Sequence, residues 1–259
     1  MPFDHFAHNY DADFTHTQIG KKQRQIVHDF ILQKLSTFQS VFEVACGTGE
    51  DATWLAQQGK RVLATDISPK MLETGRQKAG ALCSINIEWK QLDITKLDGE
   101  EIQGRYDWIF SNFGGLNCLS PALLQDFLKH AHQRVLASNG RIVLVMMSKC
   151  SIWEIMFALR RLNISKAFRR WTNNALPVNV KGTSIPTWYY NPSFFRKLDG
   201  FEVERVQTVG FFLPPSYLES FFAKRPKLLN ALFRMEKRWS TWAFLANFSD
   251  HYLIVLRPK

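Results

Sequence analysis

The chain has 259 residues, of which 46% are hydrophobic and 22% charged, so it is long enough to bury the core of one large domain with a modest cap. Its net charge of +10 permits an anionic partner, but no nucleic-acid-binding module is recognisable, so we expect no nucleic acid partner. Four scattered cysteines and the lack of a signal peptide or bilayer-spanning run predict a cytoplasmic protein without a metal site.

The N-terminal segment is expected to form a cap. Residues 3–11 are aromatic and polar, and they include Tyr10. Residues 19–35 are predicted to be a helix, because Ile26, Val27 and Phe30 recur at helical spacing.

A short apolar run from Val41 predicts a buried parallel strand, which breaks into a glycine turn and resumes as a helix at about Asp51. Gly47 and Gly49 allow a ligand to approach bare backbone, as in nucleotide-binding loops. Glu43 stands just before the turn. A carboxylate there would repel a pyrophosphate and suit a cationic ligand.

The next strand, Arg61–Asp66, ends in a carboxylate about 20 residues after the glycine turn, the place of a ribose ligand in nucleotide folds. The alternative is that Asp66 caps the following helix. Ser68 can cap that helix by itself, so the ribose interpretation is favoured.

These motifs resemble those of the class I S-adenosylmethionine-dependent methyltransferases of the small-molecule, UbiE-like type. The resemblance rests on Glu43-x-Ala45-Cys46-Gly47-Thr48-Gly49, on Asp66-Ile67-Ser68-Pro69-Lys70-Met71-Leu72, and on an F-D-x-x-A-x-x-Y-D pattern that ends at Asp11. It implies S-adenosylmethionine as the cofactor. The cofactor-binding residues that it implies are Tyr10, Glu43, Ala45, Gly47, Gly49, Asp66, Ile67, Met71, Asp93, Ile94, Asn112 and Phe113.

Two further strands are predicted at residues 85–92 and 106–110. In the family that the chain resembles, the aspartate in the position of Asp93 accepts a hydrogen bond from the adenine amino group. The alternative is a surface turn. The loop after the fourth strand is where such folds meet their ligands, and Asn117 either faces the substrate or satisfies this turn.

Residues 121–137 are predicted to be an amphipathic helix, and residues 141–147 a very apolar fifth strand. Five strands therefore alternate with helices. This alternation predicts an α/β fold with a doubly wound, mostly parallel sheet.

The remaining chain predicts a cap and an antiparallel edge. Residues 151–171 form an expected helix with a basic face, and residues 177–190 a hairpin that offers Trp188 and Tyr190 to a substrate or to cross-strand packing. Strands at residues 201–206 and 251–256 would complete seven strands. We expect one domain over residues 1–259, capped by residues 1–35, 151–190 and 214–247.

The resemblance implies methyl transfer to an O, N or C nucleophile of a small, apolar or aromatic molecule. Lipid, nucleic acid or protein acceptors are the alternative within the fold, and an NAD(P)-dependent oxidoreductase or a non-catalytic binding protein the alternatives outside it. No catalytic residue is assigned, although His5, His8 and His16 lie in the N-terminal cap. Peripheral membrane contact and the oligomeric state stay open.

Overall fold

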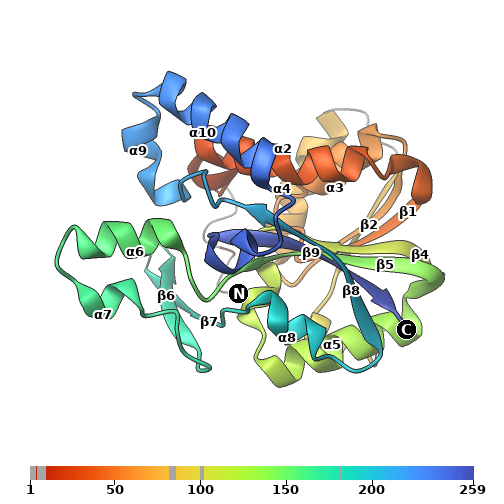
Figure 1. Ribbon diagram of the computed structural model, residues 1–259. Coiled ribbons are helices and arrows are strands. Elements are labelled where there is room, and N and C mark those ends of the chain that lie inside the picture. The colour runs from red at the N-terminus through yellow and green to blue at the C-terminus, as the bar shows by residue number, and fades with distance from the viewer. Residues whose placement is uncertain (1–3, 5–9, 82–85, 100–101, 181) are drawn as a thin grey trace.

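A seven-stranded sheet with the order β3-β2-β1-β4-β5-β9-β8 runs through the centre of the protein (Figure 1). The computed structural model describes all residues except 1–3, 5–9, 82–85, 100–101 and 181. The strands are β1 (Ser40–Val44), β2 (Arg61–Asp66), β3 (Ile87–Gln91), β4 (Tyr106–Ser111), β5 (Leu136–Met147), β8 (Phe201–Val209) and β9 (His251–Pro258). Strands β1 to β5 are parallel, and β9 runs antiparallel between β5 and β8. The predicted seven-stranded, mostly parallel sheet is confirmed.

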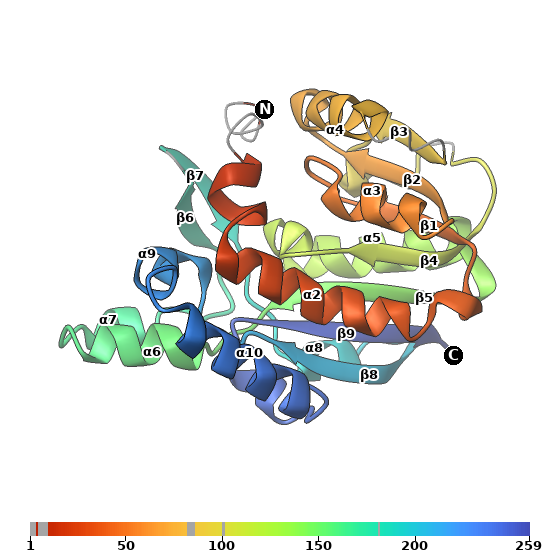
Figure 2. The same cartoon turned by 90° about the horizontal axis from the view of Figure 1, so that it is seen from above.

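Helices cover both faces of this sheet (Figure 2). They are α2 (Gln18–Leu32), α3 (Glu50–Gln57), α4 (Pro69–Ala81), α5 (Pro121–Arg134), α8 (Pro192–Arg196) and α10 (Pro226–Trp239). Val41 and Val143 pack with the apolar sides of α2, α3 and α10, whereas Phe42 and Leu144 pack with α5 and α8. The central strands are apolar at successive positions because both of their faces are buried.

Two predicted boundaries differ from the structure for local reasons. The helix expected over residues 121–137 ends at Arg134, because Leu136 already begins β5, whose backbone pairs with β4 at Tyr106. The helix expected over residues 151–171 is two short helices, α6 (Ile152–Leu159) and α7 (Ile164–Ala167). Leu162 between them has a left-handed φ of 54°, which no α-helix continues.

The predicted hairpin exists with a shifted register. Strands β6 (Leu176–Val180) and β7 (Thr183–Thr187) pair with each other, so Trp188 to Tyr190 follow the second strand instead of forming it. The other elements are short helical segments. They are η1 (Asp11–Thr15), η2 (Leu35–Thr37), η3 (Ile94–Lys96), η4 (Gly115–Cys118), η5 (Ser216–Leu218), α9 (Glu219–Phe222) and η6 (Leu245–Phe248).

The carboxyl ends of the parallel strands open at one edge of the sheet, and the cap elements lie at that edge. Helix α6 begins five residues beyond the end of β5, and Figure 2 shows α6, α7, α9 and the β6–β7 hairpin at the same end of the molecule. Strand β9 starts there too, since His251 pairs with Met147. Across the described residues, no helix has the length and apolar character needed to cross a membrane.

Candidate active site

The glycine turn after β1 has a backbone that only small residues accept. Ala45, Gly47 and Gly49 have left-handed φ values of 53°, 56° and 66°. A Cβ atom on Gly49 would lie 2.2 Å from the Trp89 ring, so glycine is required there for packing as well as for φ. A Cβ on Gly47 would approach a described atom only at the Tyr10 ring, 3.9 Å away. Gly47 therefore leaves open backbone facing the N-terminal segment.

Asp66 ties the ends of β1 and β2 together. One carboxylate oxygen accepts the Gly47 N–H at 2.9 Å, and the other accepts the Ser68 N–H at 2.9 Å. Burial raises the pKa of Asp66, and these two hydrogen bonds offset part of that rise. Ser68 itself accepts the Met71 N–H and so caps α4, as the sequence suggested. Each Asp66 oxygen keeps acceptor capacity for a hydroxyl group.

Glu43 is a buried carboxyl whose Oε2 atom has no hydrogen-bond partner among the described residues. Burial holds the pKa of Glu43 well above its usual range, and the charge of Asp51 raises it further, whereas Arg24 opposes this effect. An orphaned acceptor beside open backbone is costly unless a donor or a cation reaches it. This side chain fits a ligand that brings positive charge.

A charged network, which no sequence motif indicated, joins α2, α3 and the loop after β4. Asp51 contacts Arg24 Nη1, lies 2.7 Å from His28 Nε2 and accepts Asn112 Nδ2–H at 2.9 Å. Although burial opposes ionisation, Arg24 and His28 hold the pKa of Asp51 well below its usual range. Arg24 and His28 are four residues apart on α2, a spacing that places them on one helix face but does not reveal their partner.

The N-terminal segment is fastened over the glycine turn by polar contacts. Asp11 accepts hydrogen bonds from Thr48 Oγ1 at 2.7 Å and from Lys78 Nζ at 2.9 Å, and Asp4 accepts one from Ser68 Oγ at 2.5 Å. Tyr10 lies beside Gly47, and burial raises its pKa. This segment therefore covers the place where the turn exposes its backbone.

Asp11, His16 and Glu50 bring potential metal-binding atoms to within 4.8 Å of one another. The ammonium group of Lys78 already forms ion pairs with Asp11 and with Glu50, each at 2.9 Å. The Lys78 ammonium group therefore already balances the charge of these two carboxylates. His5 and His8, the other histidines considered as bases, lie outside the described residues.

The remaining predicted cofactor residues line the same strand ends. Met71 is buried, Ile67 and Ile94 are partly buried, and Asp93 caps η3 by accepting the Thr95 N–H at 3.0 Å. Phe113 has a left-handed φ of 47° directly after Asn112, and Arg24 lies over its ring. Their roles toward a cofactor stay predictions.

The three residues predicted to contact a substrate are engaged with the protein itself. Asn117 is fully buried, donates to the carbonyl of Trp188 at 2.5 Å and accepts the Met147 N–H at 3.0 Å. The hydroxyl of Tyr190 donates to the Leu119 carbonyl at 2.6 Å, and Trp188 packs against the core on the α5 side. These contacts favour the alternative interpretations, a hydrogen-bonded turn for Asn117 and packing for Trp188 and Tyr190. They hold together the loop after β4 (the β4 loop), β5 and the hairpin.

A histidine at the start of β9 faces the β4 loop, and no local sequence motif indicates that it lies there. The ring of His251 meets the Phe113 ring edge to face, with 5.7 Å between their centres, and its Nδ1 lies 3.2 Å from Asp250. Although burial opposes ionisation, His251 and Arg170 hold the pKa of the Asp250 carboxyl well below its usual range. Only the antiparallel placement of β9 brings this imidazole to the carboxyl edge of the sheet.

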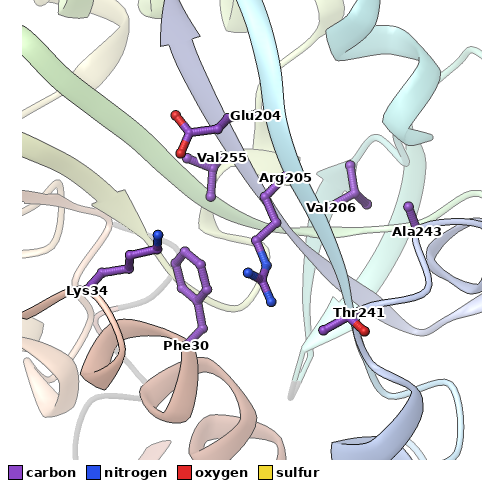
Figure 3. Close-up of a pocket in the computed structure, with 8 residues that line it drawn as sticks. All are labelled: Phe30, Lys34, Glu204, Arg205, Val206, Thr241, Ala243 and Val255. Atoms are coloured by element: carbon purple, nitrogen blue, oxygen red, sulfur yellow. The ribbon is translucent and has the colours of Figure 1, made fainter.

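A shallow groove of about 490 Å³ lies elsewhere, between the end of α2 and strand β8 (Figure 3). The Arg205 guanidinium lies 5.3 Å from the centre of the Phe30 ring across it. Glu204 and Lys34 line its rim. None of these residues belongs to the strand ends or to the glycine turn, so the groove is separate from the candidate site.

Methyltransferases resemble the part of the chain that holds the glycine turn and Asp66. Residues 41–140 match the family model described as a methyltransferase domain. The chain is 31% identical over 137 residues to the uncharacterized methyltransferase sll0829 of Synechocystis, covering 52% of this chain and 59% of that protein. It is 30% identical over 142 residues to the demethylmenaquinone methyltransferase of Clavibacter sepedonicus, covering 55% of each chain. Over this part of its length the chain is therefore similar to methyltransferases.

The fold of a solved methyltransferase agrees with this similarity. The magnesium protoporphyrin IX methyltransferase from Synechocystis PCC 6803, determined with bound S-adenosylhomocysteine, matches with a TM-score of 0.57 and 16% identity, over 93% of this chain and 85% of that one. The sequence relatives are matched over little more than half of their own length. The methyltransferase fold extends over most of the chain, whereas the sequence likeness to these relatives covers about half of it.

Proposed function

We propose that this methyltransferase binds S-adenosylmethionine at the glycine turn and transfers its methyl group to a small, apolar or aromatic molecule. The observation that carries the proposal is the buried Glu43 carboxyl, which has an oxygen without a partner among the described residues and stands four residues before the open backbone of Gly47. S-adenosylmethionine supplies a methyl group activated by a sulfonium charge. The oxidoreductase alternative is disfavoured, because a cationic ligand stabilises the ionised form of this carboxyl group, whereas a pyrophosphate opposes its ionisation.

In this proposal each strand end has one task. Asp66 accepts from the ribose hydroxyls, Glu43 faces the cationic end of the cofactor, and Asp93 accepts from the adenine amino group. Tyr10 closes over the cofactor from the N-terminal segment. Asp51, through Arg24 and Asn112, positions α2 and the β4 loop around them. Because the donor is already activated, the protein contributes mainly alignment, which is worth roughly 7–11 kcal/mol when two reactants are well oriented.

The acceptor side is assigned to the β4 loop around Phe113 and to His251. An imidazole held by the Asp250 carboxylate is suited to take a proton from an acceptor that must lose one. The relative from Clavibacter sepedonicus is named for a quinone substrate and the Synechocystis structure for a porphyrin. Both are small ring systems, which supports an acceptor of that class here.

Replacing Asp66 with alanine is expected to lower the affinity for S-adenosylmethionine by about 10- to 100-fold, because the ribose hydroxyls lose a charged acceptor worth about 1.5–3 kcal/mol. Isothermal titration calorimetry measures this loss. Asp107→Ala is the matched control, since Asp107 also accepts two backbone N–H groups, from Gln39 and Ser40, but at the start of β4. Equal losses in the two variants would contradict the ribose assignment.

Binding of the cofactor is expected to release protons from Glu43. Its pKa is raised in the free protein, and an ammonium or sulfonium group alongside would lower it again. At a pH above the ordinary glutamate value of 4.5, but below the raised value, the carboxyl therefore loses its proton on binding. The measured binding enthalpy should then differ between buffers with different ionisation enthalpies. Glu43→Gln should remove that difference, and a wild-type enthalpy independent of buffer would refute this role.

Incubating the protein with labelled S-adenosylmethionine and a panel of quinone, phenol and porphyrin acceptors tests the activity itself. Labelled product with any of them supports the proposal. Tight cofactor binding without transfer across the panel would instead favour a binding protein, and NADH binding in place of S-adenosylmethionine would favour the oxidoreductase.

A further inference from the structure

One end of the cap exposes large apolar side chains that the methyltransferase site does not use. Leu162, Ile164 and Trp171 are 91%, 67% and 61% exposed, and they lie on α7 and in the turns before and after it. A second group comes from η5 and α9, where Tyr217 and Phe221 are also exposed. Single exposed apolar residues need no explanation, but a cluster of them at one end marks an interaction site.

The two groups form one surface. The rings of Phe157 on α6 and Tyr217 on η5 are 5.7 Å apart, and Trp153 meets Phe222 at the same centre-to-centre distance. Figures 1 and 2 both show α6, α7 and α9 at the same end of the molecule. We call this surface the docking patch. Its apolar members are Leu162, Ile164, Phe168, Trp171, Tyr217 and Phe221.

The charge around the docking patch is mostly positive, and Glu219, the carboxylate on α9, accepts the Gln18 and Ile19 N–H groups at the start of α2. Residues 155–180 contain five lysines or arginines and no aspartate or glutamate, and residues 220–235 contain four and none. Within the part of the chain that the structure describes, no ion pair involves six exposed cations that follow α6 or α9 closely in the chain. They are Arg160, Arg161, Lys166, Lys224, Arg225 and Lys227. The nearby carboxylate of Glu154 is buried and held by Arg169 and Arg170.

This pattern matches the chemistry of an anionic bilayer surface. Leucine, isoleucine and tryptophan side chains insert at the boundary between headgroups and acyl chains, while lysine and arginine beside them meet anionic headgroups. The exposed cations would also suit a nucleic acid, but the exposed leucine and isoleucine side chains would not. Helix α6 follows the end of β5, at the carboxyl edge of the sheet where the candidate site lies. A membrane bound by the docking patch would therefore lie on the side from which an apolar molecule would enter the site.

We propose that the docking patch attaches this protein peripherally to membranes that contain anionic lipid. The attachment does not depend on methyl transfer. It accounts for the excess of positive charge in the cap and for apolar residues that the described part of the chain leaves exposed.

Co-sedimentation with lipid vesicles tests the proposal. The full chain is expected to bind vesicles of phosphatidylcholine mixed with phosphatidylglycerol, to bind phosphatidylcholine alone at least about tenfold more weakly, and to dissociate as salt is raised. The double variants Leu162→Ser with Ile164→Ser, and Arg160→Glu with Lys166→Glu, should each bind the anionic vesicles at least about tenfold more weakly. All four positions are exposed, so thermal unfolding should be unchanged.

Lys129→Glu with Arg134→Glu is the matched control, because it removes the same charge from exposed positions on α5. This variant should bind anionic vesicles as the wild type does, within about twofold. Equal weakening by the control would reduce the effect to net charge and overturn the patch. Absence of vesicle binding, self-association through the patch without lipid, or a preference for nucleic acid would also overturn it. Titration of S-adenosylmethionine in the same buffer reports the proposed function separately.

Discussion

Replacing Gly47 with valine is expected to abolish measurable S-adenosylmethionine binding, with a loss of at least about 100-fold, or roughly 2.7 kcal/mol. The residue has a φ of 56°, which a β-branched side chain rarely adopts, and its N–H is held by Asp66. The new side chain would also fill the space between the turn and Tyr10, where the proposal places the cofactor. Isothermal titration calorimetry of the purified variant measures the loss.

Gly59→Val separates backbone strain from blocked approach. Gly59 also has a left-handed φ, 80°, but it lies beyond the end of α3, and a Cβ there would meet no described atom within 4 Å. Both variants should lose roughly 1–3 kcal/mol of unfolding free energy from strain. Only Gly47→Val should lose the cofactor. If it keeps its affinity, or if Gly59→Val loses affinity to the same extent, the turn is not the binding site.

Glu236→Ala is expected to lower the free energy of unfolding by at least about 3 kcal/mol. This carboxylate lies on α10, is fully buried, and accepts the Thr208 hydroxyl and the N–H groups of residues 210–213. Truncation would leave these buried donors without an acceptor, which is more costly than the loss of the hydrogen bonds alone. Chemical denaturation followed by circular dichroism measures the change.

Glu73→Ala is the control for helix propensity, since Glu73 is an exposed glutamate within α4. It should change stability by less than about 0.5 kcal/mol. The segment that Glu236 holds also packs next to Asp250, because a Cβ on Gly210 would lie 3.5 Å from the Asp250 side chain. A stable Glu236→Ala variant would show that another group satisfies these donors.

The elements around the glycine turn were predictable because their signals are local. A strand that is buried on both faces has a run of apolar residues in the sequence. Glycines indicate a turn whose left-handed φ values disfavour other residues. That Ser68 caps α4 was also predictable, and Asp66 instead accepts the Gly47 and Ser68 N–H groups. Each of these inferences uses residues within a few positions of one another.

The contacts in the cap were not predictable, because an aromatic or amide side chain has the same local pattern whether it lines a cavity or packs in a core. Tyr190 and Asn117 lie on segments about 70 residues apart, and each is satisfied by a carbonyl of the other region. The helix expected over residues 151–171 was wrong in its continuity, since apolar spacing persists through the left-handed Leu162.

The sequence alone determined the order of strands and helices, the glycine turn and the carboxylate that follows it, since periodicity and turn chemistry are properties of neighbouring residues. The tertiary structure alone decided the partners. It set Asp51 against Arg24 and His28, gave Glu236 its five donors, and carried His251 to the edge where β4 ends. These contacts join residues far apart in the chain, and only the closing of the sheet, with β9 antiparallel between β5 and β8, makes them neighbours.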